Sequence, residues 1–174
     1  TVRGSVKLWM DKFPLEAERT SFIIKSWLEA DGDIEMIREH VIQWLKKYPE
    51  EIETHFVLKS WLDAGGSKEL VEDYVKRWLD KYGDRLEVSF VITAWLGAEG
   101  DLHLMEPYML QWLQKYPEEK EVEFVIVAWL KAGGSRETIK TYFKRWIEKY
   151  PEKQETEFAL VTWLKTGGPR ETIE

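Results

Sequence analysis

Tryptophan recurs along this chain at a spacing that few folds can accommodate. Its positions rise in equal steps from the second tryptophan onward, and the first step is longer by a single position: Trp9, Trp27, Trp44, Trp61, Trp78, Trp95, Trp112, Trp129, Trp146 and Trp163. Every second tryptophan lies in a repeated phrase such as FVLKSWLDAGG (residues 56–66), whose five copies begin at Phe22, Phe56, Phe90, Phe124 and Phe158. A period of about 20 to 50 residues is typical of solenoids, in which each repeat packs against its neighbours. The simplest interpretation is a 34-residue repeat of two helices, with one tryptophan in each.

The second helix of each repeat has the clearer pattern. In residues 70–82, LVEDYVKRWLDKY, the apolar residues are spaced as on one face of an amphipathic helix. Asp33, Ser67, Asp101 and Ser135 stand at its start, where a side-chain oxygen can accept a hydrogen bond from a first-turn N–H. We expect a left-handed residue to end the preceding helix at the glycine positions 32, 66, 100, 134 and 168.

The first helix is expected to begin near three Pro-Glu pairs, at Pro49, Pro117 and Pro151, since proline suits a first turn and glutamate complements the helix dipole. On a helical wheel, Val57 and Trp61 share an apolar face, whereas Phe56 and Ser60 fall on nearly the opposite side. We therefore expect this inner helix to be buried on two sides, against its partner helix and the neighbouring repeat. The tryptophans would be core residues, each burying about 150–250 Å². A stacking platform for sugars or bases is the less favoured alternative.

The sequence therefore predicts an all-α protein, an α-solenoid of about five 34-residue two-helix repeats in a single array over residues 1–174. The array consists of a partial repeat 1–14, the repeats 15–48, 49–82, 83–116 and 117–150, and a partial repeat 151–174.

Two known families share features with this repeat. The 34-residue helix–turn–helix unit, with proline after the second helix, resembles tetratricopeptide-type repeats. That resemblance implies a scaffold that binds a protein or peptide partner. The Gly-Gly turn in a 34-residue unit is also similar to that of TAL-effector DNA-reading repeats, in which the residues before Gly-Gly read bases. Here those residues are Asp63-Ala64 and Lys131-Ala132.

Composition narrows the classes of partner. Hydrophobic residues make up 44% of the 174 residues and charged residues 33%, which suits a packed core under a solvated surface. A net charge of −7 argues against nucleic acid or anionic lipid as the partner. The sequence has no run of about 18 apolar residues, so we expect no membrane span. The absence of cysteine and of a signal peptide predicts a cytoplasmic protein.

Candidate catalytic and metal-binding groups are scattered. His40, His55 and His103 occupy different positions in their repeats and lack the spacing of metal ligands. His40 aligns with tyrosines of other repeats, which indicates a partly buried packing residue. Ser67 and Ser135 stand at helix starts, and no pattern indicates an activated nucleophile. We therefore expect neither an enzyme nor a metal or cofactor.

One line of the inner helix escapes both apolar faces and varies between repeats. Its positions are spaced i, i+4 and i+8, and in solenoids the inner helices line an extended concave groove. We predict a groove for a peptide or a partner helix there, although exposed positions also vary when nothing constrains them. The candidate partner-binding residues are Lys25, Glu29, His55, Lys59, Asp63, Ser89, Thr93, Glu123, Val127, Lys131, Val161 and Lys165.

The two ends of the sequence look complementary. GGPRETIE at the C-terminus matches the opening of a second helix, and SVKLWMDKF near the N-terminus matches the closing half of one. A second function class is therefore head-to-tail self-association into a ring or filament, in which one chain completes a repeat of the next. A fragment cut from a longer array is the alternative. The candidate self-association residues are Trp9, Phe158, Trp163 and Ile173.

Overall fold

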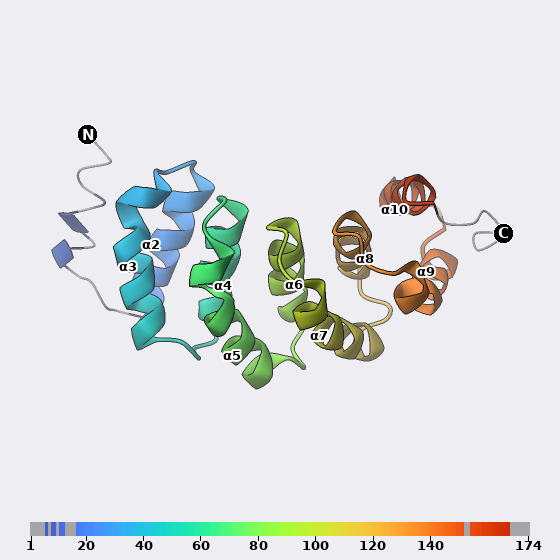
Figure 1. Ribbon diagram of the computed structural model, residues 1–174, viewed down its shortest axis with the longest axis horizontal. Coiled ribbons are helices and arrows are strands. Elements are labelled where there is room, and N and C mark those ends of the chain that lie inside the picture. Colours follow the sequence, from blue (N-terminus) through green and yellow to red (C-terminus); the bar gives the residue numbers. More distant parts are fainter. Residues whose placement is uncertain (1–5, 7, 10, 13–16, 152–153, 168–174) are drawn as a thin grey trace. The chain divides into compact units, whose positions relative to one another are not determined.

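The computed structural model describes residues 6, 8–9, 11–12, 17–151 and 154–167, and all regular structure in these ranges is helical (Figure 1). The α-helices are α2 (Ala17–Glu29), α3 (Ile34–Lys47), α4 (Thr54–Asp63), α5 (Glu72–Tyr82), α6 (Val88–Gly97), α7 (Leu102–Lys115), α8 (Val122–Lys131), α9 (Arg136–Lys149) and α10 (Gln154–Lys165). A 3-10 helix, η1 (Lys68–Leu70), precedes α5. The predicted all-α class and the two helices per repeat are confirmed for the described residues.

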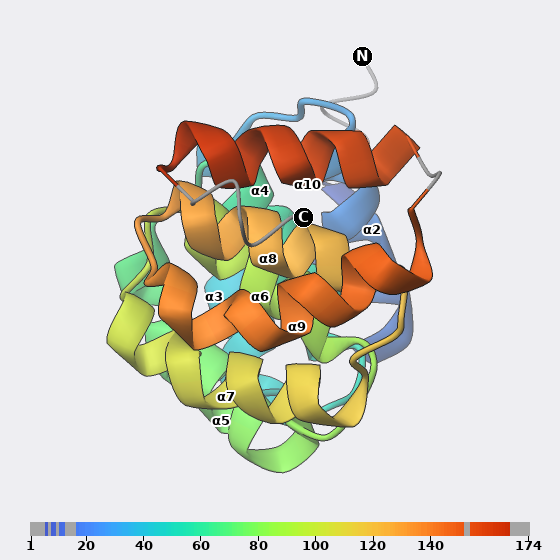
Figure 2. The same ribbon diagram turned by 90° about the vertical axis from the view of Figure 1, so that its right-hand side faces the viewer.

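The chain divides into two compact units, residues 1–82 (unit 1) and residues 83–174 (unit 2), at the boundary between two repeats. We call α2, α4, α6, α8 and α10 the first helices and α3, α5, α7 and α9 the second helices. In unit 1, α2 packs against both α3 and α4. In unit 2, α8 packs against α6, α9 and α10 (Figure 2). Within each unit, a first helix therefore contacts its own second helix and also the next first helix.

The first helices α2, α4, α6 and α8 are each joined to the following turn by a contact between tryptophan and glycine, whereas Gly168 after α10 lies outside the described residues. Trp61 is almost fully buried, its Nε1 donates to the backbone oxygen of Ser67 at 3.0 Å, and the N–H of Gly66 donates to the Trp61 carbonyl at 2.9 Å. A Cβ on Gly66 would lie 2.3 Å from Trp61 Cε2, because the indole ring covers that glycine. The same contact recurs in the pairs Trp27–Gly32, Trp95–Gly100 and Trp129–Gly134. The predicted role of these tryptophans as core residues is confirmed.

The left-handed residue lies one position before the predicted glycine. Positive φ angles occur at Asp31 (53°), Gly65 (80°), Glu99 (56°), Gly133 (85°) and Gly167 (86°). The predicted assignment to positions 32, 66, 100 and 134 is therefore wrong, and position 168 lies outside the described residues. The invariant glycine is required because the indole ring occupies the space of a side chain, whereas the left-handed position also accepts aspartate and glutamate.

The predicted helix caps are confirmed for the aspartates only. Asp33 accepts a hydrogen bond from the N–H of Glu35 at 3.0 Å, and Asp101 accepts one from the N–H of His103 at 2.9 Å. Ser67 does not cap a helix, since its hydroxyl donates to the carboxylate of Glu69 and the chain continues as η1. Ser135 precedes α9 without a capping hydrogen bond from its side chain.

Pro49-Glu50 and Pro117-Glu118 lie in turns before α4 and α8, which begin at Thr54 and Val122, so these predicted starts are several residues too early. Glu152, of the third pair, lies outside the described residues. In unit 1, the carbonyl oxygen of Glu50 accepts hydrogen bonds from Lys81 Nζ at 2.9 Å and from the Tyr82 hydroxyl at 3.0 Å. In unit 2, the carbonyls of Asp84 and Glu118 make the same pair of bonds with the lysine and tyrosine at the end of the next second helix. Second-helix side chains thus bond the carbonyls of the segment before each of these first helices, and α4 begins only at Thr54.

Candidate functional site

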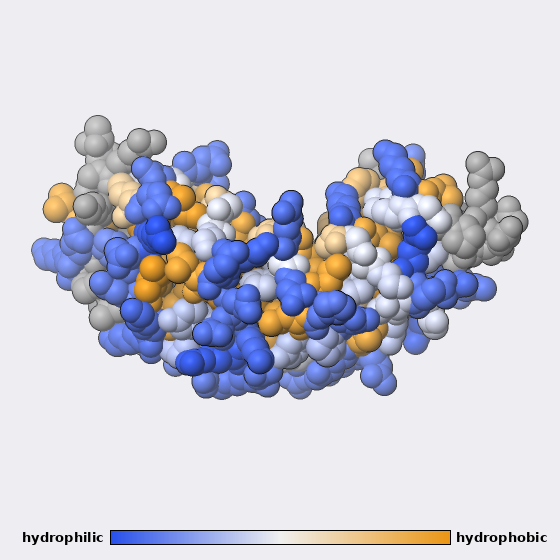
Figure 3. Space-filling model, in the orientation of Figure 1, coloured by the Kyte–Doolittle hydropathy of each residue, from blue (hydrophilic) through white to orange (hydrophobic). Residues whose placement is uncertain are grey.

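The phenylalanine that opens the repeated phrase is exposed in every copy. The exposed fraction of the residue ranges from 39% at Phe56 and Phe90 to 66% at Phe22, with Phe124 and Phe158 between them. The expectation that this side of the helix is buried is therefore wrong for the phenylalanine, although it holds for Ser60 and Ala94 on the same side, which are each 4% exposed. Hydrophobic surface is visible among hydrophilic side chains in the region of unit 2 that carries α8 and α10 (Figure 3). Clustered exposed apolar residues commonly mark interaction sites.

The first position of the predicted partner-binding line is buried rather than exposed. His55, Ser89 and Glu123 are each at most 4% exposed. Two of these side chains serve the turn before the helix: Nδ1 of His55 lies 2.5 Å from the Ile52 carbonyl oxygen, and the Ser89 hydroxyl donates to the Leu86 carbonyl at 3.0 Å. Their polarity reflects backbone hydrogen bonding in a buried place and not contact with solvent, so their predicted exposure is wrong.

The surface line that the structure presents instead starts at the phenylalanine and follows the spacing i, i+3 and i+7. We call phrase positions 1, 4 and 8 of the first helices the exposed line. Val127, at phrase position 4 on α8, is only 7% exposed and borders a cavity. The other predicted residues on this line are half-buried or exposed, namely Lys25, Glu29, Lys59, Asp63, Thr93, Lys131, Val161 and Lys165.

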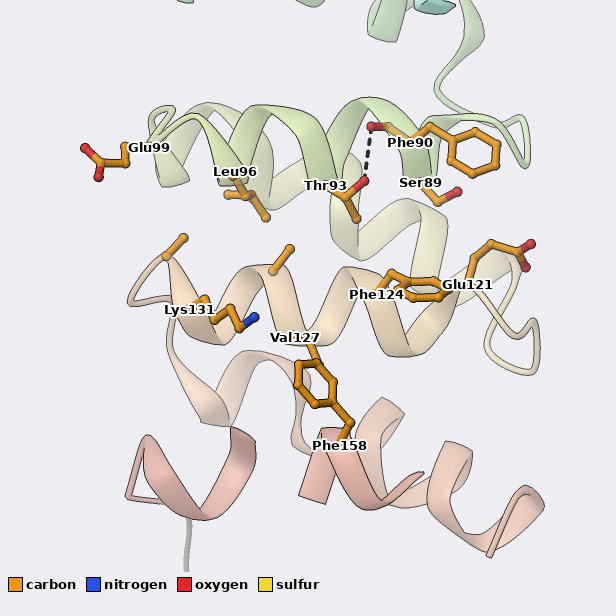
Figure 4. Close-up of a pocket in the computed structure, with 13 residues that line it drawn as sticks. Ser89, Phe90, Thr93, Leu96, Glu99, Glu121, Phe124, Val127, Lys131 and Phe158 are labelled. Carbon is orange, nitrogen blue, oxygen red and sulfur yellow. Dashed lines mark hydrogen bonds between the residues drawn. The ribbon is translucent and has the colours of Figure 1, made fainter. Parts of the chain in front are cut away.

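In unit 2 the exposed line opens into a cavity of about 570 Å³ between α6, α8 and α10 (Figure 4). Phe90, Phe124 and Phe158, one from each of these helices, contribute to its lining. Thr93 and Val127 line its middle, at phrase position 4 of α6 and α8. Three successive repeats thus contribute one aromatic ring each to the same cavity.

The hydroxyl groups in the lining already donate hydrogen bonds to backbone carbonyls, so they are not free to bond a ligand. The Thr93 hydroxyl donates to the Phe90 carbonyl at 3.1 Å (dashed in Figure 4), and the Ser89 hydroxyl donates to a turn carbonyl. Gly97 enlarges the cavity, since a Cβ placed there would meet no atom within 4 Å. The cavity therefore offers carbon surface and aromatic faces with few free hydrogen-bonding groups.

Charged side chains stand at the two ends of the cavity. Glu121 precedes the first residue of α8, and Lys131 is its last residue (Figure 4). With ten residues in α8, the two groups are separated by one helix length of about 15 Å. Lys131 Nζ lies 5.0 Å from the ring centroid of Phe158, within the range of a cation–π interaction. Glu121 Oε2 is shielded from solvent and accepts no hydrogen bond from the described residues.

In unit 1, charged side chains occupy the corresponding positions. Lys25 forms an ion pair with Glu29 at 3.9 Å, and Lys59 forms one with Asp63. Lys25 Nζ also lies 4.9 Å from the centroid of the Phe56 ring, so it covers one of the two exposed phenylalanines of this unit.

The predicted self-association residues differ in exposure. Trp163 is 1% exposed, so it is not available for contact at the surface, and Trp9 is half-buried. Phe158 lines the cavity, and Ile173 lies outside the described residues. Val161, which the sequence analysis assigned to the partner-binding line, and Leu164, which it did not single out, are 39% and 43% exposed on α10. Their counterparts on α8, Val127 and Leu130, are 7% and 3% exposed in the repeat that α10 packs against.

Other candidate groups are dispersed. Within the described ranges, no three His, Asp or Glu side chains come together as metal ligands, and no helix is both long and apolar enough to cross a membrane. His40 is half-buried, as predicted, and its Nε2 lies 2.9 Å from Asp11 Oδ1. Comparison of the chain with protein-family models, curated proteins and solved structures finds no match in any of the three. The resemblance to tetratricopeptide repeats is thus one of repeat length and layout.

Proposed function

We propose that this chain is a non-catalytic α-solenoid of about five 34-residue repeats, which binds a peptide or protein partner on the exposed line of its first helices. Two features support the solenoid: within each unit a first helix packs against the next first helix, and the tryptophan–glycine contact recurs after α2, α4, α6 and α8. Neighbour-to-neighbour packing of this kind creates an extended surface suited to a linear partner.

The cavity of unit 2 is the observation that carries the binding proposal. Its volume of about 570 Å³ is large enough to hold one or more apolar side chains of a partner. Phe90, Phe124 and Phe158 are already solvent-exposed, so a partner gains by removing them from water without first displacing another part of the chain. Buried aromatic contacts at the centre of an interface usually supply most of its binding energy.

Selection of peptides from a random display library on the full chain tests this proposal. The test variant is Thr93→Lys/Val127→Lys, which places in unit 2 the residue type that unit 1 has at Lys25 and Lys59. We expect selected peptides to bind it about tenfold more weakly or worse, since lysines would fill the cavity. Thr141→Lys, on the exposed surface of α9, is the matched control and should retain affinity. Equal binding to all three proteins, or no enrichment at all, would contradict the proposal.

Head-to-tail self-association is the second candidate, and the exposed face of α10 favours it. Val161 and Leu164 are exposed at positions that a neighbouring first helix covers on α8. A contact from another chain that covered these side chains would repeat the packing of α8 against α10. Light scattering over a dilution series should then show a mass that rises with concentration in the wild type and not in Val161→Lys/Leu164→Lys. A constant monomer mass at high micromolar concentration would reject this candidate.

A further inference from the structure

The unit 2 cavity has few free hydrogen-bonding groups, and this constrains the backbone conformation of a partner peptide. This inference rests on the proposed function, because it specifies which kind of peptide the same site takes. A strand that binds by edge pairing needs free backbone groups on its host, and the cavity is walled by helices, whose backbone groups bond within the helix. The hydroxyls of Ser89 and Thr93 are bonded to carbonyls as well. An extended peptide would bury polar backbone groups there without partners, which costs free energy, whereas a helix bonds its own.

The dimensions of the site also suit a helix. The apolar strip between Glu121 and Lys131 is one helix length, about 15 Å, which matches about ten residues of an incoming α-helix. Over that length a helix presents apolar residues at i, i+3 or i+4, and i+7 along one face. One large side chain can then enter the cavity beside Val127 and Phe158, while the one nearer Glu121 contacts Phe90 and Phe124 (Figure 4).

The charges at the two ends give the incoming helix a direction. Lys131 lies at the C-terminal end of α8, and Figure 4 shows the Glu99 side chain at the same end but turned away from the cavity. Glu121 lies at the N-terminal end, where Figure 4 shows its carboxylate at the rim of the cavity, beyond Phe124. A helix with an acidic first turn and a basic last turn complements both charges only when it runs antiparallel to α8. The same direction places its dipole favourably against those of α6 and α8.

We infer that the ligand of unit 2 is an amphipathic α-helix of a partner protein, docked antiparallel to α8, with an acidic residue at Lys131 and a basic residue at Glu121. The helix carries apolar residues at i, i+3 or i+4, and i+7 between these charges.

The experiment repeats the library selection on the wild type and on the charge-swapped variant Glu121→Lys/Lys131→Glu. Wild-type peptides should carry the acidic residue before the apolar residues and the basic residue after them, and the swapped variant should select the reverse order. A given peptide should lose about two- to fivefold in affinity for each mismatched end, the usual range for an exposed ion pair. Replacing a central, non-contacting peptide residue with proline should abolish binding, whereas alanine at that place should retain it.

The outcomes separate this inference from the proposed function. Peptides that bind the wild type but not Thr93→Lys/Val127→Lys support binding in the cavity. If such peptides tolerate the central proline, or have the same charge order whether selected on the wild type or on Glu121→Lys/Lys131→Glu, the helical ligand is contradicted and cavity binding is not. The absence of any peptide that distinguishes the wild type from Thr93→Lys/Val127→Lys would overturn the proposed function itself.

Discussion

In unit 1 the exposed line of α2 and α4 carries a lysine three residues after each phenylalanine and an acidic residue four positions further on, and the two side chains pair. In unit 2 the same positions hold Thr93 and Gly97 on α6 and Val127 and Lys131 on α8. The phenylalanines are exposed in both units, yet charged pairs stand beside them in unit 1 and a cavity opens beside them in unit 2.

This difference shows that the cavity comes from side chains on a common backbone plan. The helices α4, α6 and α8 are each ten residues long, and each ends in the same contact between tryptophan and glycine. What differs is a small set of residues on the exposed line, of which Gly97 has no side chain at all. A shared core with a variable surface predicts that core substitutions act alike in both units and that surface substitutions do not.

Removing a first-helix tryptophan should have the largest effect, and the same effect in each unit. Trp61 in unit 1 and Trp95 in unit 2 are 2% and 1% exposed, and each donates one hydrogen bond to the following turn. Trp61→Ala and Trp95→Ala should each cost about 3–5 kcal/mol, the usual range for deleting a buried aromatic side chain. Denaturant midpoints followed by hydrogen exchange in each unit provide the measurement. A decrease in unfolding free energy below about 1 kcal/mol in either unit would contradict a common core.

The glycine that lies under the indole ring should be nearly as sensitive. Gly66→Ala and Gly100→Ala place a Cβ about 2.3 Å from Cε2 of Trp61 or Trp95, so the ring must move. Overpacking of this kind costs about 1–3 kcal/mol. Gly65→Ala is the neighbouring control: nothing lies within 4 Å of its Cβ, and only its φ of 80° is unfavourable, at about 1 kcal/mol. The contact would lose its assigned role if Gly66→Ala proved milder than Gly65→Ala in thermal unfolding.

Gly97 distinguishes the two units most directly, since unit 1 has Glu29 and Asp63 at its position. Gly97 is the last residue of α6, and an added Cβ meets no atom. Gly97→Ala should stabilise unit 2 by about 0.5–1 kcal/mol, because alanine favours the helix, with a small loss of affinity. Gly97→Glu should gain less stability, since its negative charge lies at the C-terminal end of the helix dipole, but it fills part of the cavity and weakens peptide binding more strongly. Unchanged affinity in Gly97→Glu would place binding elsewhere.

The helical plan of the repeat was predictable from the sequence because it depends on period alone. Evenly spaced tryptophans, two in each repeat and with apolar neighbours at helical spacing, leave few alternatives to two helices per repeat. The burial of Trp61 and Trp95 follows from the same pattern. The position of the left-handed residue was missed because glycine serves two purposes in this turn, and Gly65 and Gly66 are adjacent.

The candidate site was predicted only in part, because polarity was taken as a measure of exposure. Ser89 and His55 are polar and buried, since each side chain bonds a carbonyl of the preceding turn. Phe90 and Phe124 are apolar and exposed, and only the position of the neighbouring helices reveals it. The cavity itself depends on the space that Gly97 leaves between helices, which a single helical wheel does not represent.

The smallest effect we predict concerns the ion pairs that tie a second helix to the turn before its first helix. In unit 2, Glu118 receives hydrogen bonds from Lys149 at 2.7 Å and Arg145 at 2.5 Å, whereas the carboxylate of the equivalent Glu50 in unit 1 lies 3.8 Å from Lys81 Nζ. The two cations beside Glu118, Lys149 first and then Arg145, lower its pKa from 4.5 to about 2.

The sign of the resulting pH dependence follows from that lowered pKa. Because the folded pKa of Glu118 lies below the unfolded value, the stabilisation is fully present above pH 4.5 and is lost as the pH falls toward about 2. Glu118→Gln should therefore be less stable than the wild type at neutral pH, by a small amount because the pair is solvent-exposed, and the two unfolding curves should converge near pH 2. Glu50→Gln, with its longer ion pair, should show a smaller difference. Urea midpoints of the three proteins between pH 7 and pH 2 decide the matter: a gap that persists at pH 2, or an equal gap in both variants, would show that the ion pair of Glu118 is not its cause.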